Sequence, residues 1–315
     1  MIVSLTHEHD LDGLGSQAII KRYFDLNNKH ESKNLTLLYA QYIDFSDKIK
    51  FILNIDELPK ELIISDIGFN EGFLEIFPLI KKAFTLGCRI SWFDHHIVDP
   101  IVKEKIKLMT SIYVNDEKKC AAEIVQNYLL PDDEIAIYIA KLARDSDFKT
   151  KKFQLAKNLQ SIIGYNRGEE KFEERRHIVD LLSKGEFSHS WFDSQLNDIK
   201  VWIEEQSDLA LNTATKYPLH ENKEFIVSFS GIGGGKINDI VQEKYPNMFA
   251  YIGIDKRYGE IIIHSDHINC RDFAMSFGGG GHEERAGFKY PNIFSSQGII
   301  NQEFIKDVKN LIRKY

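Results

Sequence analysis

The sequence has 315 residues, of which 43% are hydrophobic and 28% charged, and its formal net charge is −7. This length can form one large domain or two smaller ones with a real core, and the acidic balance argues against unspecific binding to duplex nucleic acid. The 3 cysteines form no C-x-x-C pair and no apolar run reaches the roughly 18 residues of a membrane span, which argues against a disulfide framework, a cysteine zinc site and a membrane protein.

Residues 1–150 alternate short apolar runs with amphipathic stretches. Runs typical of strands occupy residues 2–5, 35–43, 61–68, 89–96 and 111–115, and helix-like segments occupy residues 15–28, 71–87 and 120–130. Strands that alternate with helices favour a parallel α/β sheet. Ligands of such sheets bind beyond the carboxyl ends of the strands. The sequence therefore predicts an N-terminal domain built on a parallel sheet.

The second half of the sequence has a different pattern. Residues 151–220 have a helical and strongly charged pattern, and the later part predicts a long connecting helix. Strand-like runs follow at 225–230, 248–255 and 260–265, with a helix at 236–245 between the first two. We therefore expect a smaller α/β domain after a helical linker, with boundaries at 1–190, 191–223 and 224–315.

Side chains that can bind metal follow the predicted strands of the first domain. They come from four segments: residues 7–12 after the first strand, Asp66 at the end of the third, residues 94–96 at the end of the fourth, and Asp145 with Asp147 after the helical stretch 133–144. Carboxylates crowded at one edge of a sheet repel one another, and each loses hydration when buried. A bound cation would compensate for both effects.

The same segments resemble the motifs of the DHH phosphoesterase family. "HEHDLDGLGS", "LIISD", "SWFDHH" and "ARDSDF" follow one another in the order and at the spacing of that family. The stretch "INCRDFAMSFGGGGHEERAGF" (268–288) resembles the DHH-associated C-terminal domain. The resemblance covers nearly the whole chain. It implies a two-domain phosphodiesterase of the oligoribonuclease, nano-RNase or short-dinucleotide type.

The resemblance also implies roles for single residues. The implied metal ligands, with Asp66 bridging two ions, are His7, Asp10, Asp12, Asp66, His95 and Asp145. His96 would contact the substrate phosphate, and Asp94 would ligate or orient. The first motif departs from the family, because histidines stand three residues and one residue before Asp10. His7 is favoured there over His9, and Asp147 is the alternative to Asp145.

A glycine run in the C-terminal part is the candidate substrate-binding segment. Its residues are Gly278, Gly279, Gly280, Gly281 and the following His282. Backbone N–H groups without Cβ atoms nearby let a phosphate approach closely, although a glycine run can also be a simple turn. Arg285 and Arg271 are further candidates for substrate binding, and a solvated position is the alternative for Arg271.

Carboxylate and imidazole ligands without thiolates favour Mn²⁺ over metals that prefer soft ligands. The expected cofactors are therefore two divalent ions, Mn²⁺ above all, which would activate water and neutralise phosphoryl charge. We expect a short RNA or dinucleotide such as pApA as substrate, with adenosine bisphosphate as a further substrate. Neither a membrane nor a stable nucleic-acid duplex is expected as a partner, and a homodimer is left open.

Three alternatives are a RecJ-type single-strand exonuclease, an inorganic pyrophosphatase and a non-catalytic nucleotide-binding scaffold. The first residues lack the basic region and the long apolar stretch of a signal peptide, so a cytoplasmic protein is expected.

Overall fold

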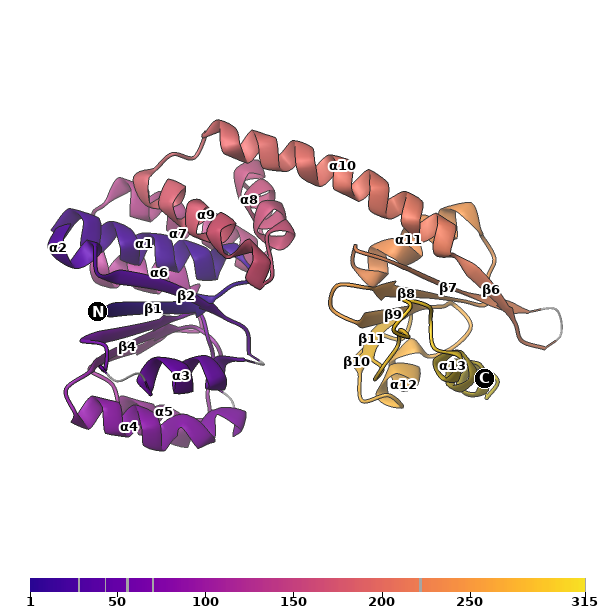
Figure 1. Ribbon diagram of the computed structural model, residues 1–315, viewed down its shortest axis with the longest axis horizontal. Coiled ribbons are helices and arrows are strands. Elements are labelled where there is room, and N and C mark those ends of the chain that lie inside the picture. Colours follow the sequence, from indigo (N-terminus) through magenta and orange to yellow (C-terminus); the bar gives the residue numbers. More distant parts are fainter. Residues whose placement is uncertain (28, 43, 55–56, 70, 221–222, 315) are drawn as a thin grey trace. The chain divides into compact units, whose positions relative to one another are not determined.

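The computed structural model describes residues 1–27, 29–42, 44–54, 57–69, 71–220 and 223–314 (Figure 1). Contacts within the chain divide it into two compact units, Met1–Ile199 and Lys200–Tyr315. Helix α10 (Ser190–Thr213) crosses this division, in the region where the sequence predicts a long connecting helix. Among the described residues, no helix is both long and apolar enough to cross a membrane.

The sheet of the first unit has five strands in the order β2-β1-β3-β4-β5, and all four neighbouring pairs are parallel, as predicted. The strands are β1 (Ile2–His7), β2 (Leu35–Ala40), β3 (Glu61–Ser65), β4 (Arg89–Asp94) and β5 (Ile112–Asn115). Strands β2, β3 and β4 end two or three residues before the predicted ends, because the backbone leaves the sheet where the polar segments begin. Residues 28, 43, 221 and 222, which fall within predicted segments, lie outside the described residues.

Helices cover both faces of this sheet, with α1 and α6 on one face and α3, α4 and α5 on the other (Figure 1). Because strand side chains alternate, Leu62, Ile64, Ile90 and Trp92 join the core with α3 and α4. The helical elements of this unit are α1 (Leu11–Asn27), α2 (Lys29–Ser32), α3 (Phe45–Leu53), η1 (Glu71–Ile76), α4 (Phe77–Thr85), α5 (Pro100–Lys107), α6 (Ala121–Leu129), α7 (Glu134–Asp147), α8 (Gln154–Tyr165), η2 (Glu169–Lys171) and α9 (Phe172–Lys184).

The second unit contains a mixed sheet of six strands in the order β10-β11-β9-β8-β7-β6, in which β7 and β8 are parallel and the other neighbours antiparallel. Its core is formed by apolar residues of β7, β8 and β9 that pack against α12 and α13. The elements are β6 (Thr215–Pro218), β7 (Glu224–Ser230), α11 (Gly234–Lys244), β8 (Ala250–Asp255), β9 (Glu260–His264), α12 (Cys270–Met275), β10 (Gly280–Gly281), β11 (Arg285–Lys289) and α13 (Gln302–Ile312). The fold is thus α/β with two separate sheets.

Candidate metal centre

The carboxyl ends of three neighbouring strands form the candidate site. Strand β1 ends at His7, β3 is followed by Asp66, and β4 ends at Asp94 with His95 and His96 directly after it. The chain leaves β1 toward β2 on one side and β3 lies on the other side, so the strand order reverses between β1 and β3. Ligand sites of open α/β sheets lie at such switch points. The fold therefore brings the predicted strand-end residues to the expected edge.

Asp66 lies in the middle of this edge in an unusual environment. Its backbone has a φ of 56°, in the left-handed region that non-glycine residues seldom adopt. Its side chain is only 2% exposed, and the Oδ2 atom makes no hydrogen bond to any described residue. Burial raises the pKa of this carboxyl, and the charge of Asp10 adds to the effect. A buried carboxylate oxygen without a hydrogen bond is costly, and the ring of His7, 3.6 Å away, lies beyond hydrogen-bond distance.

One group of candidate ligands consists of His7, Asp10 and Asp66, whose ligand atoms lie within 4.8 Å of one another. His7 Nδ1 is 3.2 Å from Asp10 Oδ2 and 3.6 Å from Asp66 Oδ2. Burial lowers the pKa of His7, but its two acidic neighbours outweigh burial and raise that pKa to about 10. Burial raises the pKa of Asp10, but the His7 contact prevails and lowers it to about 2. The protonated imidazole thus supplies positive charge that this group requires.

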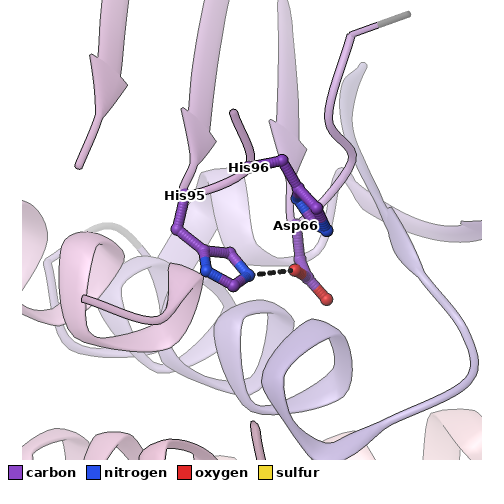
Figure 2. A group of neighbouring side chains, drawn as sticks. All are labelled: Asp66, His95 and His96. Carbon is purple, nitrogen blue, oxygen red and sulfur yellow. Dashed lines mark ion pairs between the residues drawn. The ribbon is translucent and has the colours of Figure 1, made fainter. Parts of the chain in front are cut away.

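A second group consists of Asp12, His95 and Asp147, again with ligand atoms within 4.8 Å of one another. His95 Nε2 lies 3.6 Å from Asp12 Oδ2 and 3.4 Å from Asp66 Oδ1, and His95 Nδ1 lies 3.8 Å from Asp147 Oδ2. Figure 2 shows the Asp66 carboxylate and the His95 ring directed toward each other. Asp66 therefore contacts a residue of each group.

Asp12 also has a structural role. Its two oxygens accept hydrogen bonds from the backbone N–H groups of Ala121 and Ala122 at 2.7 and 2.8 Å, at the first turn of α6. A carboxylate has about four lone-pair positions, so these two bonds leave room for a metal. Burial raises the pKa of Asp12, and the Asp66 charge adds to this rise. Asp12 thus couples the start of α6 to the candidate centre.

The structure separates the two aspartates of the fourth segment. Asp147 belongs to the second group of ligands, whereas Asp145 accepts hydrogen bonds from Lys152 N at 2.7 Å, from Phe153 N at 3.0 Å and from the Thr150 hydroxyl. The pKa of Asp145 is lowered, chiefly by the Thr150 bond. Asp145 therefore holds the loop after α7, and we replace it by Asp147 among the candidate ligands.

His9 also lies apart from the two groups. Its Nε2 atom is 3.7 Å from Glu8 Oε1, and burial, together with the nearby charge of Arg167, lowers its pKa to about 4. Glu8 pairs at 3.2 Å with Arg175, a buried arginine of α9. The geometry thus favours His7 over His9 as the imidazole of the first motif. The sequence analysis missed Arg175, which lies in a charged helical run without a distinguishing signal.

His96 forms a hydrogen-bonded pair with Asp94 and also belongs to a third group, with Asp66 and His95, whose ligand atoms lie within 4.8 Å of one another (Figure 2). Asp94 is 1% exposed, and its Oδ1 lies 2.8 Å from His96 Nδ1. The other ring nitrogen, Nε2, lies 2.9 Å from the hydroxyl of Tyr42, a residue that the sequence analysis missed although it follows β2 at the same edge. Burial lowers the pKa of His96, but the Asp94 bond and charge outweigh burial and raise it. Asp94 therefore orients His96 with Nε2 directed away from the pair.

The residues of both groups fit divalent cations. The donor set contains carboxylate oxygens and imidazole nitrogens, which suit Mn²⁺, Mg²⁺ or Fe²⁺. A pocket of about 240 Å³, lined in part by Asp10, Asp12 and Asp147, lies at this edge. The Oδ2 of Asp66, buried and without a hydrogen bond to any described residue, can accept a metal ion as a further partner. His7, Asp10 and Asp66 would hold one ion, and Asp12, Asp66, His95 and Asp147 a second.

The glycine run lies in the second unit, where Gly280 and Gly281 form β10 and pair with β11. A Cβ on Gly279 would lie 2.2 Å from Gly287 O, and one on Gly281 would lie 2.6 Å from Ala286 Cα. Close packing on β11 thus requires at least two of these glycines.

The remaining candidate substrate residues are two glycines of the run, His282 and two arginines. Gly278 (φ 75°) and Gly280 have open space at the Cβ position, and His282 is exposed. Arg285 pairs with Asp239, and Arg271 is exposed on α12.

No family model and no curated protein match the sequence. Among solved structures, the DHH domain of a member of a family of ribosomal proteins is similar, with a TM-score of 0.59 and 17% identity over 99% of this chain and 86% of that chain. CDC45 from Entamoeba histolytica has a TM-score of 0.50 and 9% identity over 99% and 95% of the two chains. The pGpG-specific phosphodiesterase PggH from Vibrio cholerae has a TM-score of 0.49 and 12% identity over 100% and 98%. At these identities, the first two likenesses show a shared fold.

Proposed function

We propose that this chain is a metal-dependent phosphodiesterase of the DHH type. Its substrates are short oligoribonucleotides or linear dinucleotides such as pApA, which it cleaves to mononucleotides, and adenosine bisphosphate is a further substrate. The main support for the proposal is the environment of Asp66. This buried carboxylate lies at the switch point of the sheet and contacts both groups of candidate ligands, and its Oδ2 makes no hydrogen bond to the described residues. The shared DHH-domain fold supports it.

Two divalent ions, bound most favourably as Mn²⁺, would lower the pKa of a water molecule and neutralise charge on the phosphoryl oxygens. The chain itself has to position the substrate phosphate. His96 is the residue for this task, because Asp94 fixes its Nδ1 and leaves Nε2 to donate a hydrogen bond to a phosphate oxygen once the ring is protonated. In the present conformation the Tyr42 hydroxyl is hydrogen-bonded to Nε2, and the phosphate would replace it there.

Close packing holds His96 in place. A Cβ on Gly68 would lie 2.5 Å from His96 Cβ, so a glycine at this position lets the backbone after β3 approach the imidazole. Asn115 adds a hydrogen bond of 2.9 Å to His96 O. These contacts reduce the freedom of the ring before the substrate binds, which lowers the entropic cost of reaching the reactive geometry.

In this proposal, the second unit binds a nucleotide through the glycine run and His282. Gly278 and Gly280 allow close approach, and His282 and Arg271 are exposed and can reach an anionic group. A net charge of −7 gives no driving force for holding a long polyanion, so the expected substrates are short.

The proposal is tested by assaying chelator-stripped protein, before and after Mn²⁺ loading, against pApA, adenosine bisphosphate, long single-stranded RNA and pyrophosphate. We expect Mn²⁺-dependent hydrolysis of pApA. Asp66→Asn should abolish it, while Asp47→Asn, at a side chain that is 81% exposed, should leave it unchanged. Faster digestion of long RNA would instead support the exonuclease, and preference for pyrophosphate the pyrophosphatase. Nucleotide binding without any hydrolysis would support the scaffold.

A further inference from the structure

A second pocket of about 300 Å³ lies in the first unit, away from the candidate metal centre. It is lined by the starts of β3 and β4 and by the last turns of α1 and α6. Parallel strands place their starts at the edge opposite to their carboxyl ends, so this pocket lies at the other edge of the sheet from His7 and Asp66. Its volume falls at the lower end of the range for small-molecule sites.

One of the residues that line the pocket is a small side chain in the middle of the sheet. Ser91 of β4 lies in register with Ile63 of β3 and Ile112 of β5, so these residues share the sheet face that α1 and α6 cover. A β-branched apolar residue at position 91 would fill this space. Ser91 is only 2% exposed, and its Oγ makes no hydrogen bond of ordinary length to any described residue. A buried hydroxyl whose contact, with Glu61, is longer than an ordinary hydrogen bond gains stability from a further bond, which a ligand could supply.

The polar part of the pocket attracts hydrogen-bond donors. Glu61 is 8% exposed and faces the same space as Ser91, and burial raises the pKa of its carboxyl. Its counter-charge, the largely exposed Arg89, is 3.6 Å away, beyond hydrogen-bond distance. The last residues of α1 and α6 also line the pocket, and helix C-termini carry partial negative charge. Glu61 therefore has unused capacity to accept hydrogen bonds.

Four aromatic side chains also line the pocket, together with Asn27, Glu31 and Leu129. Phe93 and Tyr128 pack with ring centroids 5.4 Å apart, and Tyr128 is 51% exposed at the pocket mouth. Tyr23 and Phe24 of α1 line another side. Proteins often stack planar heterocycles on aromatic side chains and guanidinium groups. The guanidinium here belongs to Arg89.

We infer that this pocket binds a planar aromatic ring that presents two adjacent N–H donors, as guanine does, with Glu61 accepting both. A carboxylate that accepts two parallel N–H bonds gains strength and direction from the charge. Ser91 Oγ supplies one more hydrogen bond, and Phe93 and Tyr128 contact the ring faces. Adenine presents one amino group beside an acceptor nitrogen, so Glu61 would repel its edge.

The test is a titration of the full chain, kept free of paramagnetic metal, with guanosine, followed by methyl NMR. Guanosine carries no phosphate that could bind at a metal site. The methyl resonances of Ile63 and Ile112 should shift with guanosine. Adenosine should bind more weakly than guanosine by at least about tenfold. Ser91→Val, which fills the pocket, and Glu61→Gln should each weaken guanosine binding by about tenfold or more.

Glu75→Gln is the matched control, because Glu75 is 57% exposed and pairs with Lys50 outside the pocket. The Ser91→Val variant should still bind Mn²⁺, which would report an intact fold. If the Ser91→Val variant does not fold, the Tyr128→Ala variant takes its place in the test. The inference is overturned if the methyl groups of the pocket do not respond to millimolar guanosine. It is equally overturned if the pocket variants bind guanosine as tightly as the original chain, or if adenosine binds equally well.

Discussion

Asp66 combines an unfavourable backbone conformation with a buried charge. Both cost free energy, and residues with such strain persist where the surrounding structure enforces them, often at functional sites. Its backbone N–H donates to Phe93 O at 3.0 Å, which holds the turn after β3 against β4. Asparagine tolerates a positive φ nearly as well as aspartate. Asp66→Asn is therefore the substitution that removes the charge and keeps the turn.

A comparison of Asp147→Ala with Asp145→Ala tests the assignment of the fourth segment. Asp147→Ala should reduce Mn²⁺ binding and turnover and leave the melting temperature of the metal-free protein nearly unchanged. Asp145→Ala should lower that melting temperature, because Lys152 N, Phe153 N and the Thr150 hydroxyl lose their acceptor, and it should retain Mn²⁺ binding. Metal titration and thermal unfolding of both variants give the answer, and the reverse pattern would restore Asp145 as the ligand.

Mn²⁺ binding should release protons. His7 and His95 have pKa values raised to about 10 and about 9 in the metal-free protein, so both are protonated at neutral pH and must lose the proton to bind an ion. Affinity should rise with pH up to these values, by up to about tenfold per pH unit for each proton released. Calorimetry in buffers of different ionisation enthalpy counts the protons. An affinity independent of pH from 6 to about 9 would contradict the assignment.

The strand-end rule predicts which residue types gather at the site, but packing decides which of two nearby residues reaches it. Asp66, His95 and Asp10 are predictable because each follows a strand of a parallel sheet. Asp145 and Asp147 share the last turn of α7, and residues two apart on a helix point in nearly opposite directions. The packing of α7 against α1, α6 and α8 determines which of them reaches the candidate ligands.

Among the elements, the junction of β1 and α1 depends on one glycine. A Cβ on Gly13 would lie 2.1 Å from His7 O, so the start of α1 can pack against the end of β1 only without a side chain at this position. Thr6 Oγ1 also donates to Gly13 O at 2.9 Å. This close approach brings Asp10 beside His7 and Asp12 beside His95.

Gly13→Ala should therefore destabilise the metal-free protein by about 3 kcal/mol or more, because backbone atoms must move apart. Gly164→Ala is the control, since nothing lies within 4 Å of a Cβ built at this position in α8. It should stabilise the protein by about 0.5–1 kcal/mol through helix propensity. Chemical denaturation in the presence of a chelator measures both, and equal effects would show that the close approach is not required.

The sequence predicts long, strongly patterned elements better than short, glycine-rich ones. The five parallel strands and α10 follow from apolar runs and helical periodicity. The sequence analysis missed β10 because two glycines carry no apolar alternation, and it missed β6, an edge strand that contains Pro218. In both cases, pairing with a neighbouring strand forms the element, and a local pattern does not reveal such pairing.

For the whole molecule, the proposal assigns metal chemistry to the first unit and nucleotide binding to the second. His282→Ala should lower kcat/KM for pApA by about tenfold or more, because the bound nucleotide supplies orientation. It should leave hydrolysis of bis-p-nitrophenyl phosphate, which carries no nucleotide, within about twofold of the original rate. His220→Ala, at another exposed histidine of the second unit, is the control. Equal losses on both substrates would show that His282 does not contact the nucleotide.

We propose that phosphodiester hydrolysis requires two metal ions that share Asp66 as a ligand. The most direct test is the rate of pApA hydrolysis as Mn²⁺ is added in known equivalents to chelator-stripped protein. We expect no turnover in the stripped protein and a rate that rises as the second equivalent binds, with two Mn²⁺ per chain at the plateau. Hydrolysis by the stripped protein, a full rate at one equivalent, or no hydrolysis at any Mn²⁺ loading would contradict this proposal.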